Sequence, residues 1–333
     1  MAEQPDSTAI SCAKALSSFV EKGKALLDLA EKESREGSCQ EFVRQKIRIE
    51  RKQSLLGLIE AGATLYNSLS VKQKKDAEDL WSKNTNCAAL REALQDFKEL
   101  EVSSFNTKCK IFLKSILTTV VLRSAANVPQ VQWDAFLQRL DDELQLSPKI
   151  HNVDHQSKCI SPDTPLIDAR TGETVTLQKY LGRGKKILLV LIRQFSCLLC
   201  RLHVQDLQKN QSSLDAHSVQ VVVISFGCQE GASHWVEQTG CQYDMLLNPS
   251  RKMYSAFGLG ASLQKVLNFG NMLIYSEYVA NDMEFPRELP WIQDDMFQLG
   301  GNFVLDEHGR VLFSHRCQSP IDRPSVEDIL SAQ

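Results

Sequence analysis

Apolar residues recur at helical spacing along residues 10–145, with charged residues on the opposite face of each segment. In residues 10–33, for example, Leu16, Phe19 and Leu27 form one stripe. Such patterns predict helices at 10–33, 41–69, 71–83, 87–100, 105–125 and 130–145. Since these residues carry no strand signals, we predict an all-α antiparallel helical bundle with the stripes as its core.

The pattern changes after Pro162, where apolar runs of strand length alternate with helical segments. Residues 186–192 are almost continuously apolar, as expected for a strand covered on both faces. Further strands are predicted at 172–175, 219–225, 245–247 and, around a Glu-His-Gly turn, within 302–315, and helices at 199–207, 233–239, 250–257 and 325–331. A β-α-β-α order followed by β-β-α predicts an α/β domain of the thioredoxin-like fold.

The chain therefore divides into an all-helical domain at 1–147, a polar linker at 148–161 and the α/β domain at 162–333. The linker places His151, His155 and Cys159 four residues apart, which on a helix would share one face. A zinc site needs four ligands, or three and a water, so a metal site is the less favoured alternative to a solvated linker.

The composition excludes several classes of protein. With 38 Lys+Arg and 41 Asp+Glu, the net charge of -3 does not indicate nucleic-acid binding. The most apolar long stretch, 111–122, is interrupted by Lys114 and is too short to span a membrane. The first residues have neither a basic flank nor an apolar run of signal-peptide type, so we expect a cytoplasmic protein.

Cys197 and Cys200 are the one closely spaced pair among the 10 cysteines. The motif Cys197-Leu-Leu-Cys200 lies between the predicted buried strand and the next helix. A helix N-terminus favours a thiolate over a thiol, and the three-residue spacing brings both sulfurs to one face. This arrangement predicts a redox-active dithiol that uses no metal or other cofactor. There are two alternatives: the cysteines are half of a zinc site, or they are buried thiols without a chemical role.

Residues 160–333 resemble the selenoprotein L and peroxiredoxin-like 2 (selenoprotein U-type) branch of the alkyl hydroperoxide reductase/thiol-specific antioxidant group. The resemblance rests on residues 165–168, 187–193, the CxxC motif, 221–225, 254–258 and 298–306. It implies a peroxiredoxin-like fold, with Cys197 and Cys200 as the sulfur version of a site that holds two selenocysteines in selenoprotein L. It also implies a peroxide or disulfide substrate, prostaglandin-type endoperoxides included, and thioredoxin or glutathione as reductant.

The chain departs from the better-studied members of that group. When Cys200 is aligned with their peroxidatic cysteine, Cys197 stands at the Thr/Ser position of the motif and Arg193 at the Pro position. Gly300-Gly301 takes the place of the cis-proline of thioredoxins. Leu198 and Leu199 offer no side-chain donor to either sulfur, so thiolate stabilisation is expected from the helix terminus and from Arg193 or Arg201.

Other side chains near the motif have weaker expectations. Ser196 would cap the helix or bond a sulfur, and His203 would lie at the surface rather than carry protons. Trp235 and Phe257 would be core residues. Arg287 and Arg316 are candidates to approach the motif from later segments, for which the sequence gives no distance.

We expect a thiol-disulfide oxidoreductase or peroxiredoxin-like reductase in which Cys197 attacks and Cys200 resolves. A different class of function is a catalytically weak thioredoxin-like scaffold whose helical domain binds a protein partner. The roughly 150 helical residues, which a redox catalyst does not need, motivate this second hypothesis.

Overall fold

The computed structural model describes residues 7–50, 54–101, 132–146, 161–287, 289, 291–292 and 294–331, in two compact units. The first unit comprises the chain up to Gln145 together with Leu267–Glu284. The second comprises Leu146–Val266 and the chain from Phe285 onward.

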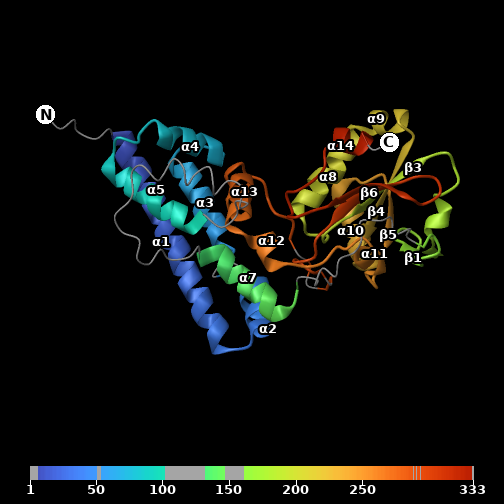
Figure 1. Cartoon of the computed structure of the whole chain (residues 1–333), viewed down its shortest axis with the longest axis horizontal. Helices are drawn as coiled ribbons and strands as arrows, with labels where there is room; N and C mark the ends of the chain where they lie inside the picture. Colours follow the sequence, from blue (N-terminus) through green and yellow to red (C-terminus); the bar gives the residue numbers. More distant parts are fainter. Residues whose placement is uncertain are drawn as a thin grey trace. The chain divides into compact units, whose positions relative to one another are not determined.

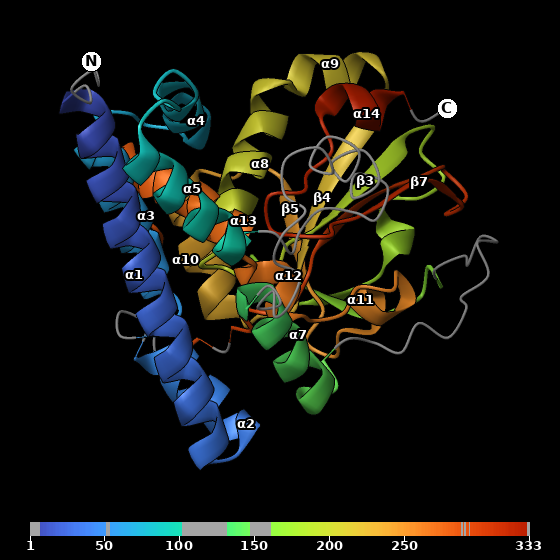
Figure 2. The same cartoon turned by 60° about the vertical axis from the view of Figure 1, so that its left-hand side comes forward.

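The first unit is all-helical, which confirms the predicted class of this half. Its elements are α1 (Ser7–Glu36), α2 (Cys39–Phe42), a π-helix (Val43–Ile49), α3 (Gly57–Ser68), α4 (Lys74–Ser82), α5 (Ala88–Glu101), α7 (Gln132–Leu144) and α13 (Phe269–Ala280) (Figure 1). α1 packs against α3 and α5, as Figure 2 shows. The predicted single helix at 41–69 is wrong, because the π-helix ends at Ile49 and α3 begins only at Gly57. The predicted helix at 105–125 and nearly all of the predicted linker lie outside the described residues.

Helix α13 corrects the predicted domain boundary, which assigned all of 162–333 to the α/β domain. The Phe269 ring lies 6.1 Å from that of Phe19 and 5.8 Å from that of Phe97, measured between centroids. Trp133 Nε1 donates to the Leu267 carbonyl (2.9 Å), and the Phe269 amide donates to Asp134 (2.8 Å). This apolar helix thus completes the core of the helical unit, since burial of aromatic rings stabilises whichever core they join.

The second unit is built on a seven-stranded mixed sheet in the order β2-β1-β5-β4-β3-β6-β7. Its elements are β1 (Leu166–Asp168), β2 (Thr174–Val175), a 3-10 helix (Leu177–Lys179), β3 (Lys186–Leu191), α8 (Leu198–Lys209), α9 (Gln211–Ala216), β4 (Val219–Ser225), α10 (Gln229–Thr239), β5 (Asp244–Leu247), α11 (Lys252–Ala256), β6 (Gly301–Leu305), β7 (Val311–Arg316) and α14 (Val326–Leu330), with α12 (Leu263–Leu267) at its boundary. β3, β4 and β5 are parallel, whereas β6 runs antiparallel to β3 and β7 to β6. This β3-α8-β4 crossover followed by the β6-β7 hairpin and α14 is the thioredoxin-like fold that the sequence predicted.

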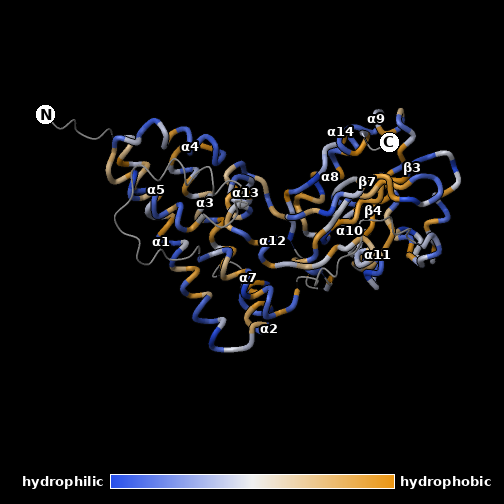
Figure 3. The backbone as a smooth tube through the Cα atoms, viewed as in Figure 1, coloured by the Kyte–Doolittle hydropathy of each residue, from blue (hydrophilic) through white to orange (hydrophobic). Residues whose placement is uncertain are grey.

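The core of this unit lies around the central strands, where Figure 3 shows the hydrophobic residues gathered. The Phe257 ring stacks on Phe303 with centroids 3.7 Å apart, and Trp235 is fully buried, so the core placement of Phe257 and Trp235 is confirmed. No helix in the described part of the chain combines the length and apolar character needed to cross a bilayer.

The prediction of a surface position for His203 is wrong. His203 lies on the buried face of α8, and its Nε2 is 2.8 Å from Asn302 Oδ1 on β6. Burial lowers the pKa of His203 to about 4, so its ring is neutral at neutral pH. The polar ring is buried at little cost because Asn302 supplies a hydrogen-bond partner.

Candidate active site around Cys197 and Cys200

The two cysteines lie at the junction between β3 and α8, where the sequence placed them. β3 ends at Leu191, and Cys197 is the N-cap residue of α8 with extended backbone dihedrals. The Cys200 amide donates to Cys197 Sγ over 3.2 Å, so the sulfur takes the role that a Ser or Asp oxygen has in most N-caps. One otherwise unpaired N–H and the positive end of the helix dipole therefore face this sulfur.

Cys200 lies one turn further on and has its own donors. The Arg193 amide donates to Cys200 Sγ (3.3 Å), and Arg323 Nη2 does so over 3.2 Å. Both cysteines are free thiols, and their residues are only 4% and 1% exposed. Both residues are therefore buried.

The two thiols differ in their ionisation. Burial opposes ionisation of Cys197, but the hydrogen bond from the Cys200 thiol and the charges of Arg193 and Arg323 outweigh it and hold the pKa of Cys197 well below its ordinary value. Burial also opposes ionisation of Cys200, and here the neighbouring Cys197 thiolate adds to it, so the pKa of Cys200 lies well above its ordinary value. Cys197 is therefore the more readily ionised of the two thiols.

Arg193, a predicted supporting residue, contacts a sulfur directly. Its Nη1 lies 3.6 Å from Cys197 Sγ. Its Nε donates to the Gln298 carbonyl (2.9 Å), and its Nη2 donates to the Met296 carbonyl. These backbone acceptors hold the guanidinium in place, because its planar fork fixes the directions of its donors.

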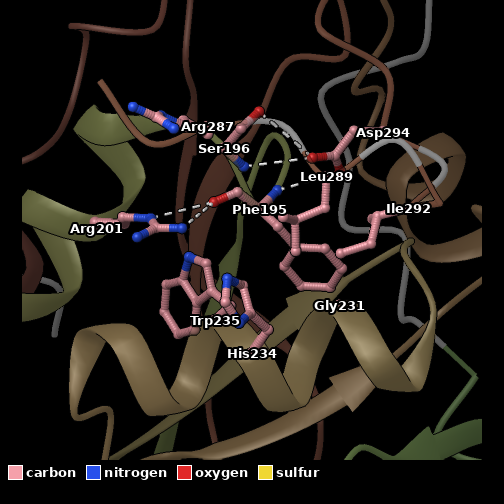
Figure 4. A pocket seen from close by; sticks show the side chains of 10 residues that line it. All are labelled: Phe195, Ser196, Arg201, Gly231, His234, Trp235, Arg287, Leu289, Ile292 and Asp294. Atoms are coloured by element: carbon pink, nitrogen blue, oxygen red, sulfur yellow. Dashed lines mark hydrogen bonds between the residues drawn. The ribbon is translucent and has the colours of Figure 1, made fainter. Parts of the chain in front are cut away.

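Ser196 and Arg201 position the loop rather than the sulfurs. Figure 4 shows Arg201 donating through Nε and Nη2 to the Phe195 carbonyl, at 3.2 and 3.1 Å. The Asp294 carboxylate accepts hydrogen bonds from the amides of Phe195 (3.2 Å) and Ser196 (3.3 Å) and from the Ser196 hydroxyl (3.4 Å). The expected capping role of Ser196 is wrong, because Cys197 itself is the N-cap and the serine hydroxyl donates to Asp294.

Arg323 and Asp294 are site residues that the sequence did not reveal. Arg323 lies 123 positions from Cys200 in the chain, yet it bonds Cys200 through Nη2 and Cys317 Sγ through Nη1 (3.5 Å). No spacing or motif marks either residue, because the tertiary fold brings them to the loop from separate later segments. The Arg316 guanidinium lies beside Gly258.

Gly300 lies where the sequence expected it, beside the motif. A Cβ at this position would stand 2.4 Å from the Leu191 carbonyl oxygen, 3.3 Å from Arg323 and 3.4 Å from Arg193. Glycine is therefore required for the start of β6 to approach the end of β3 this closely.

A metal ion would need three or more ligating side chains close together. Among the described residues, no three His, Cys, Asp or Glu side chains gather as a metal ion requires. His151, His155 and Cys159 lie outside the described residues, so that alternative stays a prediction.

Comparisons with known proteins cover about half of the chain or less. Residues 206–319 match the family model of the AhpC/TSA antioxidant enzymes, a range that begins after Cys200. Peroxiredoxin-like 2C of Homo sapiens is 24% identical over 174 residues, which cover 50% of this chain and 76% of the relative. A prostamide/prostaglandin F synthase of Xenopus tropicalis is 25% identical over 178 residues, covering 49% of this chain and 81% of the relative.

A solved structure gives a weaker likeness. The bacterioferritin comigratory protein of Xanthomonas campestris, described for its alkyl peroxide reduction activity, aligns with 12% identity and a TM-score of 0.35, over 48% of this chain and 85% of that one. The topology of the sheet, the AhpC/TSA match and the curated relatives support placing the second unit in the thioredoxin-like, peroxiredoxin-like superfamily.

Proposed function

We propose that this protein is a thiol oxidoreductase that cycles Cys197 and Cys200 between a dithiol and an intramolecular disulfide. The observation that carries this proposal is the asymmetry of the pair: the Cys197 sulfur faces the α8 N-terminus and Arg193, while burial and the neighbouring Cys197 raise the pKa of Cys200. An ionised attacking thiol next to a protonated resolving thiol is the starting state for thiol-disulfide exchange.

With a disulfide substrate, the Cys197 thiolate attacks one sulfur and displaces the other as a thiolate, which takes up a proton. Cys200 then loses its proton and attacks Cys197 Sγ, which releases the second substrate thiol and forms the 197–200 disulfide. With a hydroperoxide, Cys197 attacks the terminal oxygen and becomes a sulfenic acid while the other oxygen leaves as an alcohol or water, and Cys200 then displaces water to form the same disulfide. With an endoperoxide, both oxygens carry carbon, so the attack gives a sulfenate ester and an alkoxide that takes up a proton, and Cys200 then displaces the second oxygen as an alcohol. Either route takes two electrons from the dithiol, and a thiol reductant returns them.

The relatives narrow the choice of substrate. Their names include peroxiredoxin-like proteins and prostamide/prostaglandin F synthases, so the proposed substrates are peroxides, endoperoxides included, or disulfides. Thioredoxin and glutathione are the proposed reductants, and the cytoplasm is the proposed location. The selenoprotein L branch, in which Cys197 and Cys200 would stand for selenocysteines, also stays a proposal.

A scaffold function is the second candidate. Both sulfurs are buried, which inert structural thiols would show as well. In that case the helical unit would supply the function by binding a protein partner.

One experiment separates the two candidates. Purified protein receives one equivalent of peroxide, and the thiols are then mapped by alkylation and peptide mass spectrometry against a reduced control. We expect a rapidly formed 197–200 disulfide that thioredoxin or glutathione reverses. Cys197→Ser should abolish turnover, Cys200→Ser should trap a mixed disulfide, and Cys228→Ser, which changes a partly exposed thiol outside the motif, should behave as wild type. If Cys197 and Cys200 alkylate slowly and never pair, the oxidoreductase proposal is wrong.

A further inference from the structure

The parallel strands β3, β4 and β5 end at the same edge of the sheet. Arg193, Phe226 and Arg251 follow the ends of these strands. The Arg251 guanidinium lies over the Phe226 ring, 4.0 Å from the ring centroid. The fold thus brings Arg251, which no motif in the sequence marks, to the edge of the sheet that carries the cysteines.

Arg251 has a left-handed backbone conformation, with a φ of 52°. This conformation is unfavourable for residues that have a Cβ, whereas glycine adopts it freely. The turn after β5 imposes it, because the Arg251 amide donates to the Asn248 carbonyl and the Arg251 carbonyl accepts from the Ser255 amide (2.9 Å each). An arginine at a position suited to glycine indicates that its side chain has a role that offsets the strain.

The Arg251 side chain holds the turn formed by residues 295–298. Its Nη1 forms an ion pair with Asp295 Oδ2 (2.8 Å) and donates to Gln298 Oε1 (3.0 Å). Within the turn, the Phe297 amide donates to Asp295 Oδ1 (3.1 Å). Arg251 therefore contacts both the first and the last residue of this turn.

The backbone of the same turn holds Arg193. The Met296 carbonyl accepts from Arg193 Nη2, and the Gln298 carbonyl accepts from Arg193 Nε (2.9 Å). The remaining nitrogen, Nη1, lies 3.6 Å from Cys197 Sγ. Arg193 is buried, and no carboxylate among the described residues forms an ion pair with it. The direction of its planar guanidinium thus depends on two carbonyls of this turn.

We propose that Arg251 is a positioning residue for the attacking thiol, because it holds the turn 295–298 whose carbonyls direct the Arg193 guanidinium to Cys197. The proposal rests on the oxidoreductase function proposed above, in which Cys197 is the nucleophile. In the described chain Arg251 makes no hydrogen bond to either sulfur, so it acts through Arg193. A displaced turn would lengthen or misalign the contact between Arg193 and Cys197, and both changes weaken a charged hydrogen bond.

The test measures the rate of Cys197 alkylation by iodoacetamide against pH, on the reduced full chain, by peptide mass spectrometry. We expect Arg251→Gln to move the midpoint of this profile to higher pH. Alkylation near neutral pH should slow by about 3-fold or more, which is a fraction of what one hydrogen bond to a charged group contributes. Arg251→Lys keeps a positive charge within reach of Asp295 and should lie closer to the wild type. Cys200 and Arg323, the other groups that act on the charge of Cys197, are unchanged in these variants.

Two further variants serve as controls. Arg310→Gln breaks an ion pair of the same length, between Arg310 and Asp306 (2.8 Å), beyond the end of β6 opposite Gly301, and should keep the wild-type midpoint. Arg251→Gly removes the side chain and relieves the left-handed backbone, so it should fold even where Arg251→Gln does not. Its midpoint should still move to higher pH, because the side chain and not the backbone holds the turn.

A double-substitution cycle separates positioning from a general loss of structure. If Arg251 acts through Arg193, Arg251→Gln should not move the midpoint further in a chain that already carries Arg193→Gln. Additive shifts, an unchanged midpoint in Arg251→Gln or Arg251→Gly, or equal shifts in Arg251→Gln and Arg251→Lys would each overturn the proposal.

These outcomes are independent of the redox cycle, because the profile is measured on the reduced protein. A shifted midpoint in Arg251→Gln, in a protein that never forms the 197–200 disulfide, would support the contact chain from Arg251 to Cys197 and refute the redox proposal. An unchanged midpoint in a protein that does form this disulfide would overturn the role of Arg251 alone. If both proposals hold, peroxide should form the disulfide more slowly in Arg251→Gln, by about the factor by which alkylation slows at the same pH.

Discussion

Substitution of Gly300 by alanine tests how closely the sheet must approach the cysteine loop. The new Cβ would lie 2.4 Å from the Leu191 carbonyl oxygen, whereas a carbon–oxygen contact of this kind is normally about 3.3 Å. The start of β6 must therefore move away from β3 by roughly the difference, about 0.9 Å. Because the clash is with backbone, no side-chain rotation relieves it.

Overpacking at this position should lower the free energy of unfolding by about 1–3 kcal/mol. Alanine offsets roughly 0.4–1 kcal/mol of this loss because it restricts the unfolded chain more than glycine does. At about 2–4 °C per kcal/mol for a unit of this size, the melting temperature should fall by several degrees. The same movement displaces Arg193 and Arg323, which the Cβ would approach within 3.4 and 3.3 Å. The pKa of Cys197 should then rise.

Two assays check this prediction. Thermal unfolding measures the stability, and the pH dependence of Cys197 alkylation measures its pKa. Gly37→Ala is the control, because a Cβ at Gly37 would meet no atom within 4 Å and the substitution keeps the effect on the unfolded chain. The prediction is wrong if Gly300→Ala and Gly37→Ala have the same melting temperature and the pH profile of Cys197 alkylation is unchanged. In that case the close approach of β6 to the motif affects neither the stability nor the pKa of Cys197.

Two other substitutions test single charged groups. Arg323→Gln removes the guanidinium next to Cys200 and should shift the alkylation profile of Cys197 to higher pH, whereas Arg316→Gln should not; equal profiles would exclude Arg323 from thiolate stabilisation. Burial raises the pKa of Asp134 from 3.8 to about 6. The protonated carboxyl therefore contributes to the free energy of unfolding fully below pH 3.8, and this contribution is lost as the pH rises through 6. The difference in pKa corresponds to about 3 kcal/mol. Asp134→Asn keeps an acceptor for the Phe269 amide and should not show this loss. Urea unfolding of both proteins from pH 4 to 7 should therefore give a difference in the free energy of unfolding that changes with pH. A difference that stays constant over this range would contradict a raised pKa of Asp134.

The local patterns of the sequence were sufficient for the class of each half and for the place of the cysteines. Helical stripes such as that of α1 and the continuous apolar run of β3 reflect which faces of an element are buried, and this information lies within a few neighbouring residues. Cys197 and Cys200 could be placed at the start of α8 for the same reason, since a strand-to-helix junction is a local feature.

Features that depend on contacts between distant segments were decided only by the tertiary structure. The polar ring of His203 looked like a surface group until β6 supplied Asn302 as its partner. Helix α13 follows the α/β pattern in the chain but buries Phe269 in the helical unit. Arg323 bonds Cys200 across 123 positions of sequence. Nothing within a short window of residues records such pairings, because the free energy of a buried polar or aromatic group depends on which distant partner the fold brings to it.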